Sequence, residues 1–131
     1  MKSVIYYNQL TWPDVKKTLN TKWLILPFGS MEQHGPHLPL GTDKVLARHM
    51  ALEIAEEIGA VVAPATDYGG RSLPNSGGGP GYPGGIHFSG KLLIDMYEQL
   101  LYCYIFNKAK KILLLNAHYM LNLKWAKSYL K

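Results

Sequence analysis

The sequence predicts an α/β fold with three layers, in which helices flank a mostly parallel sheet. Two continuous apolar runs of strand length, at 23–28 and 111–116, are typical of strands covered on both faces. Two long amphipathic helical patterns lie between them, at 42–58 and 92–105. Strands that alternate with helices along the chain favour parallel pairing through right-handed crossovers.

The length and composition indicate a globular protein of one domain covering 1–131. A chain of 131 residues can bury a core, since a domain of about this size hides roughly two-thirds of its unfolded surface. The 47% hydrophobic and 18% charged residues exclude disorder as the expected state. The apolar stretches are shorter than the roughly 20 residues of a membrane span. The N-terminal segment has no apolar core of a signal peptide. We therefore expect a cytoplasmic protein with no membrane partner.

The net charge of +5 comes mainly from lysines grouped at 108–111 and 124–131. These groups lack the arginines and interleaved aromatic residues of a nucleic-acid surface, so we expect a solvated face and no nucleic-acid partner. The single cysteine, Cys103, cannot form an internal disulfide. It falls in an apolar helical pattern, which predicts a buried small hydrophobe.

The first elements follow from local signals. Thr11 can cap a short helix, with Pro13 in its first turn and Val15 and Leu19 on one face. The run at 23–28 is the first strand, bounded by a lysine and a glycine. The next helix covers 42–58 and ends at a glycine in the position that follows a helix. Its expected buried stripe consists of large apolar residues four positions apart. They are Leu46, Met50, Ile54 and Ile58.

The second half begins with a short predicted strand at 60–64. The segment 67–90 holds nine of the thirteen glycines, and so long a loop in a compact domain is usually functional or mobile. No Gly-Lys-Ser/Thr ending follows these glycines, so we do not expect a phosphate loop. Ser89 can cap the helix at 92–105, the strand at 111–116 follows, and a last short helix is expected at 121–129.

Four groups able to bind a metal lie within twelve residues of the turn-rich segment 26–43. They are Glu32, His34, His37 and Asp43. Ligands of a parallel sheet bind beyond the carboxyl ends of its strands. Glu32 and His34 follow the strand at 23–28, and His118 follows the strand at 111–116, so the fold brings them to one edge. Carboxylates mixed with imidazoles suit Zn²⁺ or Mn²⁺ better than Ca²⁺ or Mg²⁺.

Three motifs resemble the creatinine amidohydrolase (creatininase) family. They are LPFGSMEQHGPHLPLGTD at 26–43, YGGRSLPNSGGGPGYPGG at 68–85 and KKILLLNAHY at 110–119. They occur in the family's order and cover nearly all of the chain up to Tyr119. The resemblance implies a parallel α/β sheet flanked by helices, with two divalent metals bridged by an aspartate.

The resemblance also implies roles for individual residues. Glu32 and His118 hold one metal, His34 helps to hold the other, and Asp43 bridges them. Ser76 and Tyr119 line the substrate pocket, while no catalytic residue is assigned. The implied activity is hydrolysis of a C-N amide bond of a small molecule by a metal-activated water, with creatinine opened to creatine as the type reaction.

Two departures from the family pattern leave two hypotheses open. The family places a glutamate ligand where this chain has Met120, and a thioether is a soft, neutral substitute for a carboxylate. The chain also matches an N-terminal half-length version of the fold, without the C-terminal half. It is either a metal-dependent amidohydrolase or a truncated, catalytically impaired member that serves as a metal-binding or interaction module. A half-domain leaves an unpaired sheet edge, so we expect a homo-oligomer.

Overall fold

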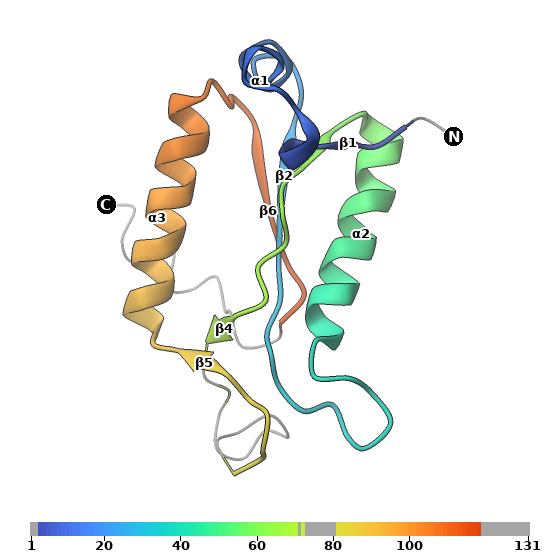
Figure 1. Ribbon diagram of the computed structural model, residues 1–131, viewed down its shortest axis with the longest axis vertical. Helices are drawn as coiled ribbons and strands as arrows, with labels where there is room; N and C mark the ends of the chain where they lie inside the picture. Colours follow the sequence, from blue (N-terminus) through green and yellow to red (C-terminus); the bar gives the residue numbers. More distant parts are fainter. Residues whose placement is uncertain (1–2, 71, 73–80, 119–131) are drawn as a thin grey trace.

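The computed structural model describes residues 3–70, 72 and 81–118 (Figure 1). Its elements follow one another along the chain as β1 (Ile5–Tyr6), the 3-10 helix η1 (Tyr7–Gln9), α1 (Trp12–Leu19), β2 (Leu24–Phe28), α2 (Thr42–Ile58), β3 (Val61–Val62), β4 (Gly69–Gly70), β5 (His87–Phe88), α3 (Gly90–Phe106) and β6 (Ile112–Asn116). In the described part of the chain, no helix is long and apolar enough to cross a membrane.

Four parallel strands form the main sheet, in the order β1-β3-β2-β6. Helix α2 covers one face and α3 the other, which confirms the predicted three-layer α/β arrangement (Figure 1). Strands β2 and β6 pair over their full length, from Leu24 opposite Ile112 to Phe28 opposite Asn116. Both strands therefore end at the same edge of the sheet. Neither β1 nor the separate two-stranded pair of β4 and β5 was predicted from the sequence.

Local capping signals fix the ends of the two long helices. Gly59 follows α2 with a φ of 69°, a left-handed conformation that glycine adopts at little cost. The Ser89 hydroxyl accepts a hydrogen bond from the Leu92 backbone N-H at 3.2 Å and so caps α3. Thr11 occupies the N-cap position of α1, but its hydroxyl bonds to the Asp14 carboxylate and not to the helix backbone.

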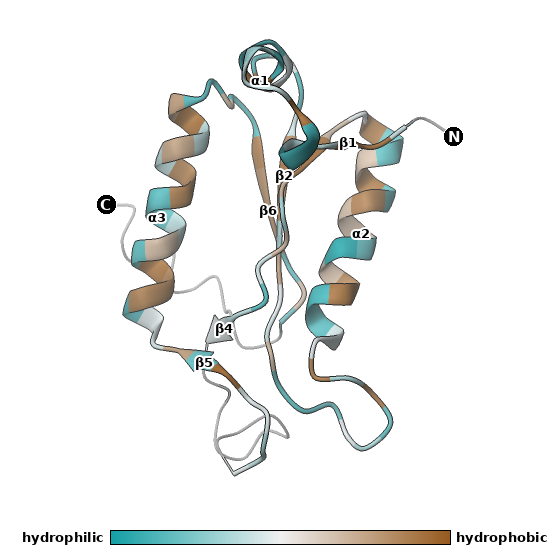
Figure 2. Cartoon of the chain, viewed as in Figure 1, coloured by the Kyte–Doolittle hydropathy of each residue, from teal (hydrophilic) through white to brown (hydrophobic). Residues whose placement is uncertain are grey.

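The buried face of α2 differs from the predicted one. Leu46 and Met50 are 50% and 45% exposed, and Ile58 is also exposed. The residues that face the sheet are small, namely Ala47, Ala51 and Ala55, with Asp43 one turn before them. Because the alanine stripe lets the helix backbone lie close to the sheet, the larger side chains are turned away. Hydrophobic segments consequently remain visible along α2 in Figure 2.

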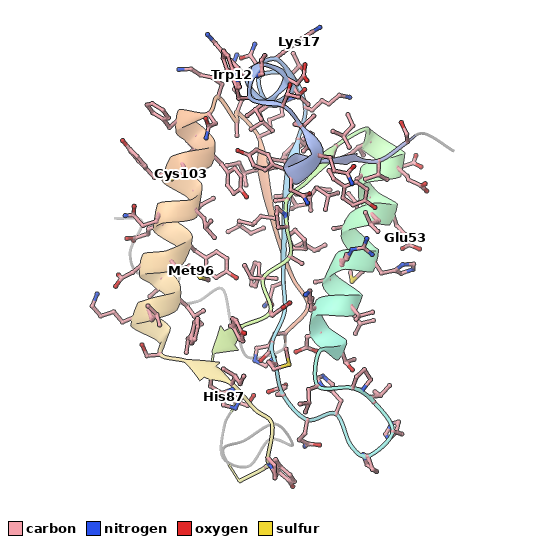
Figure 3. All side chains as sticks on the ribbon, in the orientation of Figure 1. Trp12, Lys17, Glu53, His87, Met96 and Cys103 are labelled. Atoms are coloured by element: carbon pink, nitrogen blue, oxygen red, sulfur yellow. The ribbon has the colours of Figure 1, made fainter. Side chains whose placement is uncertain are left out.

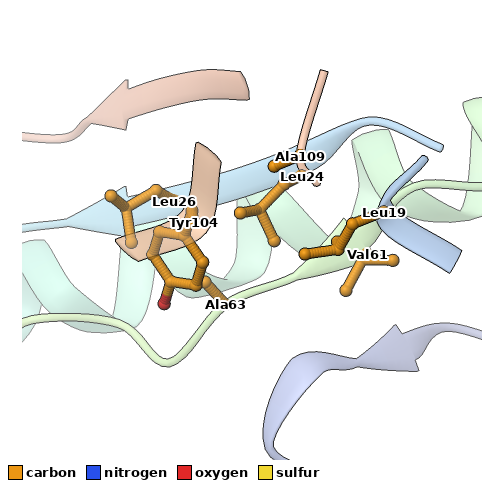
Figure 4. Packing of buried hydrophobic residues seen from close by; sticks show 7 residues of the cluster. All are labelled: Leu19, Leu24, Leu26, Val61, Ala63, Tyr104 and Ala109. Atoms are coloured by element: carbon orange, nitrogen blue, oxygen red, sulfur yellow. The ribbon is translucent and has the colours of Figure 1, made fainter. Parts of the chain in front are cut away.

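The core has two layers, one on each face of β2, because successive side chains of a strand point to opposite faces. Leu24 and Leu26 lie on the α3 side, in a cluster whose other buried members are Leu19, Val61, Ala63, Tyr104 and Ala109 (Figure 4). Ile25 lies on the α2 side, with Ala51, Ala55, Ala60 and Val62. The α2 side is therefore built mainly of small residues.

Three further expectations need correction or fall outside the structure. A strand was predicted at 60–64, but the observed strand β3 is shorter and covers only Val61–Val62. Cys103 is exposed, because its neighbour Tyr104 is the residue turned into the core. The last helix, predicted at 121–129, lies outside the described residues.

Candidate metal centre

Asp43 is the central residue of the site. It lies in the first turn of α2 and is 6% exposed. Its Oδ2 atom lies 3.0 Å from Nδ1 of His118, and its Oδ1 atom lies 3.0 Å from Nε2 of His34. A single carboxylate therefore contacts two imidazoles, one from the loop after β2 and one from the end of β6.

Glu32 completes a group of three possible ligands with Asp43 and His118. Its Oε1 atom lies 3.4 Å from Nδ1 of His118. One ligand atom from each of the three residues lies within 4.8 Å of the other two. The remaining oxygen of Glu32 accepts a hydrogen bond from the hydroxyl of the buried Ser72. Ser72 was not predicted from the sequence, because it lies in the glycine-rich loop without any periodic pattern to mark it.

The side chain of Asn116 fixes the backbone of His118. The Asn116 amide donates a hydrogen bond to the His118 carbonyl at 2.8 Å, and the His118 N-H donates to the Asn116 Oδ1 at 2.8 Å. This closed pair of bonds holds the histidine directly beyond the last residue of β6. His118 is 4% exposed, and its Nε2 has no hydrogen-bond partner within the described part of the chain. Such an orphaned buried nitrogen is unusual and marks a site under constraint.

Both ring nitrogens of His34 lie next to oxygen atoms. Its Nδ1 lies 3.0 Å from the backbone carbonyl of Glu32, so Nδ1 must carry the proton of that hydrogen bond. In a neutral ring, Nε2 then presents a lone pair to the Asp43 carboxylate, which also has only lone pairs to offer. A hydrogen bond between these two atoms needs a proton on one of them, whereas a divalent metal ion could bind both.

The donor set and its spacing fit a divalent metal. A tetrahedral ion with bonds of about 2.0 to 2.1 Å holds its ligand atoms roughly 3.3 Å apart. The contacts of 3.0 and 3.4 Å from His118 to the two carboxylates bracket that spacing. Two carboxylates with an imidazole are suitable ligands for Zn²⁺ or Mn²⁺. The residues present are thus compatible with a metal at Glu32, Asp43 and His118, with His34 on the far side of Asp43.

His37, which the sequence singled out, and His87 lie outside this group. His37 is exposed and does not belong to the group of three. His87 begins β5, at the lower end of the molecule in Figure 3, and its Nδ1 is buried without a described partner. Ser76, Tyr119 and Met120 lie outside the described residues, so their predicted roles in the substrate pocket and the second metal site stay predictions.

The fold and the site together define a class: α/β proteins with a carboxylate and imidazole centre beyond the carboxyl ends of parallel strands. The model of one family, described as creatinine amidohydrolase, matches residues 8–129. The chain belongs to this creatininase family.

Individual relatives agree with that assignment. The chain is 31% identical to the creatinine amidohydrolase of Pseudomonas putida over 121 residues, which cover 91% of this chain and 46% of the relative. It is 36% identical to the mycofactocin precursor peptide peptidase of Mycolicibacterium smegmatis over 94 residues, 62% of this chain and 36% of the relative. The structure matches the manganese form of creatininase with a TM-score of 0.86 at 28% identity, covering 95% of this chain and 55% of that one. The chain thus matches about half the length of the two creatininases and about a third of the peptidase.

Proposed function

We propose that this chain carries the metal centre of a metal-dependent amidohydrolase that hydrolyses a C-N amide bond of a small molecule. The names of two relatives, a creatinine amidohydrolase and a peptide peptidase, both denote hydrolysis of an amide bond. Creatinine, opened to creatine, is the first substrate to test. Family membership and the contacts around Asp43 support the proposal.

In this proposal Glu32 and His118 would hold one divalent metal, His34 would help to hold a second, and Asp43, which contacts both histidines, would contribute to both. Zn²⁺ or Mn²⁺ in such a site supplies Lewis-acid chemistry, which acidifies water and polarises an amide carbonyl. Ser72 orients Glu32 through its hydroxyl. Asn116 holds His118 at the end of β6, and the Glu32 carbonyl fixes the orientation of the His34 ring. Ser76 and Tyr119 are the proposed contacts to the substrate.

The observation that carries the proposal is the pair of nitrogen contacts made by the Asp43 carboxylate, each of 3.0 Å. The test is metal content after loading with Zn²⁺ or Mn²⁺, measured together with creatinine hydrolysis. His34→Ala and His118→Ala should each lower the bound metal. His49→Ala is the matched control, because His49 is exposed on α2 and pairs only weakly with Glu53 at 3.4 Å. Unchanged metal content in both site variants would refute the assignment.

A second candidate function is a catalytically impaired metal-binding or interaction module. It is favoured by Met120, which stands where the family pattern has a glutamate ligand. Two equivalents of metal with creatinine turnover would exclude this candidate. One equivalent or none, without turnover, would exclude the enzyme.

We also propose that the chain self-associates through β6. Among the described strands β6 pairs only with β2, and its Leu114 is 41% exposed although the strand sequence is almost entirely apolar. An apolar strand at a sheet edge promotes pairing with another chain. Light scattering on the purified protein tests this, and Leu114→Lys should shift any dimer towards the monomer.

A further inference from the structure

Gly29 lies directly after β2, where the first turn of α2 comes close to the chain. A Cβ atom built on Gly29 would lie 2.5 Å from the Lys44 nitrogen, 2.6 Å from the Asp43 carbonyl carbon and 2.9 Å from the Asp43 oxygen. All three are backbone atoms, so no change of rotamer relieves the clash. The peptide that joins Asp43 to Lys44 therefore rests against a position that only glycine can occupy.

Gly69 lies close to the Gly29 segment. A Cβ on Gly69 would lie 3.0 Å from the Gly29 oxygen and 2.9 Å from the Cβ of Ser30. On the helix side, Lys44 pairs with Asp67 through contacts of 2.6 and 2.8 Å, which tie the same turn of α2 to the segment after β3. The peptide between Asp43 and Lys44 is thus held by its packing against Gly29 and by the ion pair between Lys44 and Asp67.

We propose that Gly29 is a positioning residue that sets the distance between Asp43 and the other ligands, an inference that rests on the proposed metal-binding function. Glu32 follows Gly29 by three residues, so the contact joins the two segments that carry the carboxylates. A side chain at position 29 must open the 2.5 Å contact to about 3.4 Å. A shift of about 0.9 Å is enough to break the contacts of 3.0 Å from Asp43 to both His34 and His118.

The test compares Gly29→Ala with Gly41→Ala in the full chain. Gly41 precedes α2, and a Cβ atom at this position would have no neighbour within 4 Å, so the same chemical change there meets open space. Zn²⁺ titration by calorimetry should show a loss of affinity of about 10- to 100-fold for Gly29→Ala, the range seen when groups that orient ligands are removed. Gly41→Ala should stay within about twofold of the parent, less than typical orienting effects.

A metal-free measurement separates this inference from the proposed function. The ring nitrogens of His34 and His118, observed by nitrogen-15 NMR in the apoprotein, report their contacts with Asp43. Gly29→Ala should change both sets of signals, and Gly41→Ala neither. If the parent protein binds no Zn²⁺, the proposed function is wrong, while the apoprotein spectra still decide the role of Gly29. Parent-like spectra and affinity in Gly29→Ala would overturn the positioning role.

Lengthening the carboxylate at position 43 should restore the Zn²⁺ affinity lost in Gly29→Ala, which a purely structural role of Gly29 does not predict. Asp43→Glu alone should weaken Zn²⁺ binding, because it extends the carboxylate by one methylene. Combined with Gly29→Ala, which pushes the backbone back, it should recover most of the lost affinity. A double variant that shows only the sum of the two losses argues against the inference.

If Gly29→Ala does not fold, Asp67→Asn provides a second test of whether the position of the Asp43–Lys44 peptide controls metal binding. It removes the ion pair with Lys44, whose two side chains are each about one-third exposed, and should leave the core intact. Loosening the turn should lower Zn²⁺ affinity by at least about twofold, the lower range of positional effects. An unchanged affinity with unchanged apoprotein spectra would count against control of Asp43 by this packing.

Discussion

Helices α2 and α3 cover opposite faces of the same sheet, but they do so with side chains of different size. The face of α2 that meets the sheet is built of Ala47, Ala51 and Ala55, whereas α3 uses larger residues such as Leu93 and Tyr104. Small side chains let α2 approach until its first turn touches Gly29. The α2 helix therefore brings Asp43, a proposed metal ligand, into the candidate site, while α3 contributes mainly apolar cover.

This difference predicts that substitutions on the two sides of the sheet have different effects on stability and on metal binding. Changes on the α3 side should lower the free energy of unfolding and leave the proposed metal centre intact. Changes that move α2 away from the sheet should affect both, because Asp43 moves with the helix.

The largest expected effect is on the α3 side. Tyr104→Ala removes a buried ring that packs edge-on against Tyr7 with ring centroids 5.1 Å apart. We expect a loss of about 3–5 kcal/mol in the free energy of unfolding, typical of a buried aromatic residue replaced by alanine. Denaturant unfolding measures this loss. Zn²⁺ affinity, titrated well below the melting temperature, should match the parent, and a clear drop in affinity would contradict the division between the two helices.

Ala51→Leu should have a smaller effect on stability but a larger one on the site. Ala51 lies on the face of α2 that meets the sheet and is fully buried, so the larger leucine side chain should push the helix away from the sheet. We expect a cost of about 1–3 kcal/mol from overpacking, together with weaker Zn²⁺ binding. Glu53→Leu is the control, because Glu53 is exposed on the same helix (Figure 3). Equal effects of the two substitutions on Zn²⁺ affinity would show that packing distance does not control the centre.

Tyr97→Phe tests a polar contact on the α3 side and gives a pH dependence. It removes the hydrogen bond of 2.9 Å between the Tyr97 hydroxyl and Thr66, at an expected cost of about 0.5–1.5 kcal/mol. Burial raises the pKa of Tyr97 above its ordinary value of 10.0, although the Thr66 hydrogen bond opposes the shift. The folded protein thus keeps its proton at pH values where the unfolded chain loses it.

The sign of the pH effect follows from that difference. The stability contributed by the protonated Tyr97 is complete below pH 10.0 and declines as the pH rises above it. Urea unfolding at pH 8 and pH 11 should therefore show a smaller loss for Tyr97→Phe than for the parent. Burial also raises the pKa of Tyr104, which remains in both proteins and contributes equally to their decline.

The smallest expected effect is at the exposed side chains of α2. Leu46→Gln and Met50→Gln should each change the free energy of unfolding by no more than about 0.5 kcal/mol, as is usual for surface positions. The stripe predicted from the sequence would instead place both residues in the core, where their loss costs several times more. Thermal melts of the two variants distinguish the two faces directly.

The boundaries of the long helices were predictable because their signals are local. Gly59 ends α2 and Ser89 caps α3 whatever the helices pack against. The buried face of α2 was not predictable from periodicity, because the stripe of Leu46 and Met50 and the stripe of Ala47 and Ala51 have the same spacing of four residues. Only the close approach of the helix to the sheet decides between them.

In the candidate site, too, the parts that depend on packing between distant segments could not be predicted from the sequence. The positions of Glu32, Asp43 and His118 at one edge follow from parallel strands that end together, and this edge was expected from the order of strands and helices. The contacts that orient these ligands were missed, because the hydroxyl of Ser72 lies in a loop without periodicity. The role inferred for Gly29 depends on two backbone segments meeting in space, which a single sequence does not reveal.

The pairing of β2 with β6 has a consequence for how the protein folds. The central strand is made early in synthesis, but its partner follows only after α2, β3 and α3. Contacts between segments so distant in the chain close slowly, because the intervening loop entropy must be overcome first. His118 lies directly beyond that later strand, so the contacts of Glu32 and Asp43 with His118 form only after β6 has paired with β2. The candidate metal group of Glu32, Asp43 and His118 is therefore complete only when β6 has paired with β2.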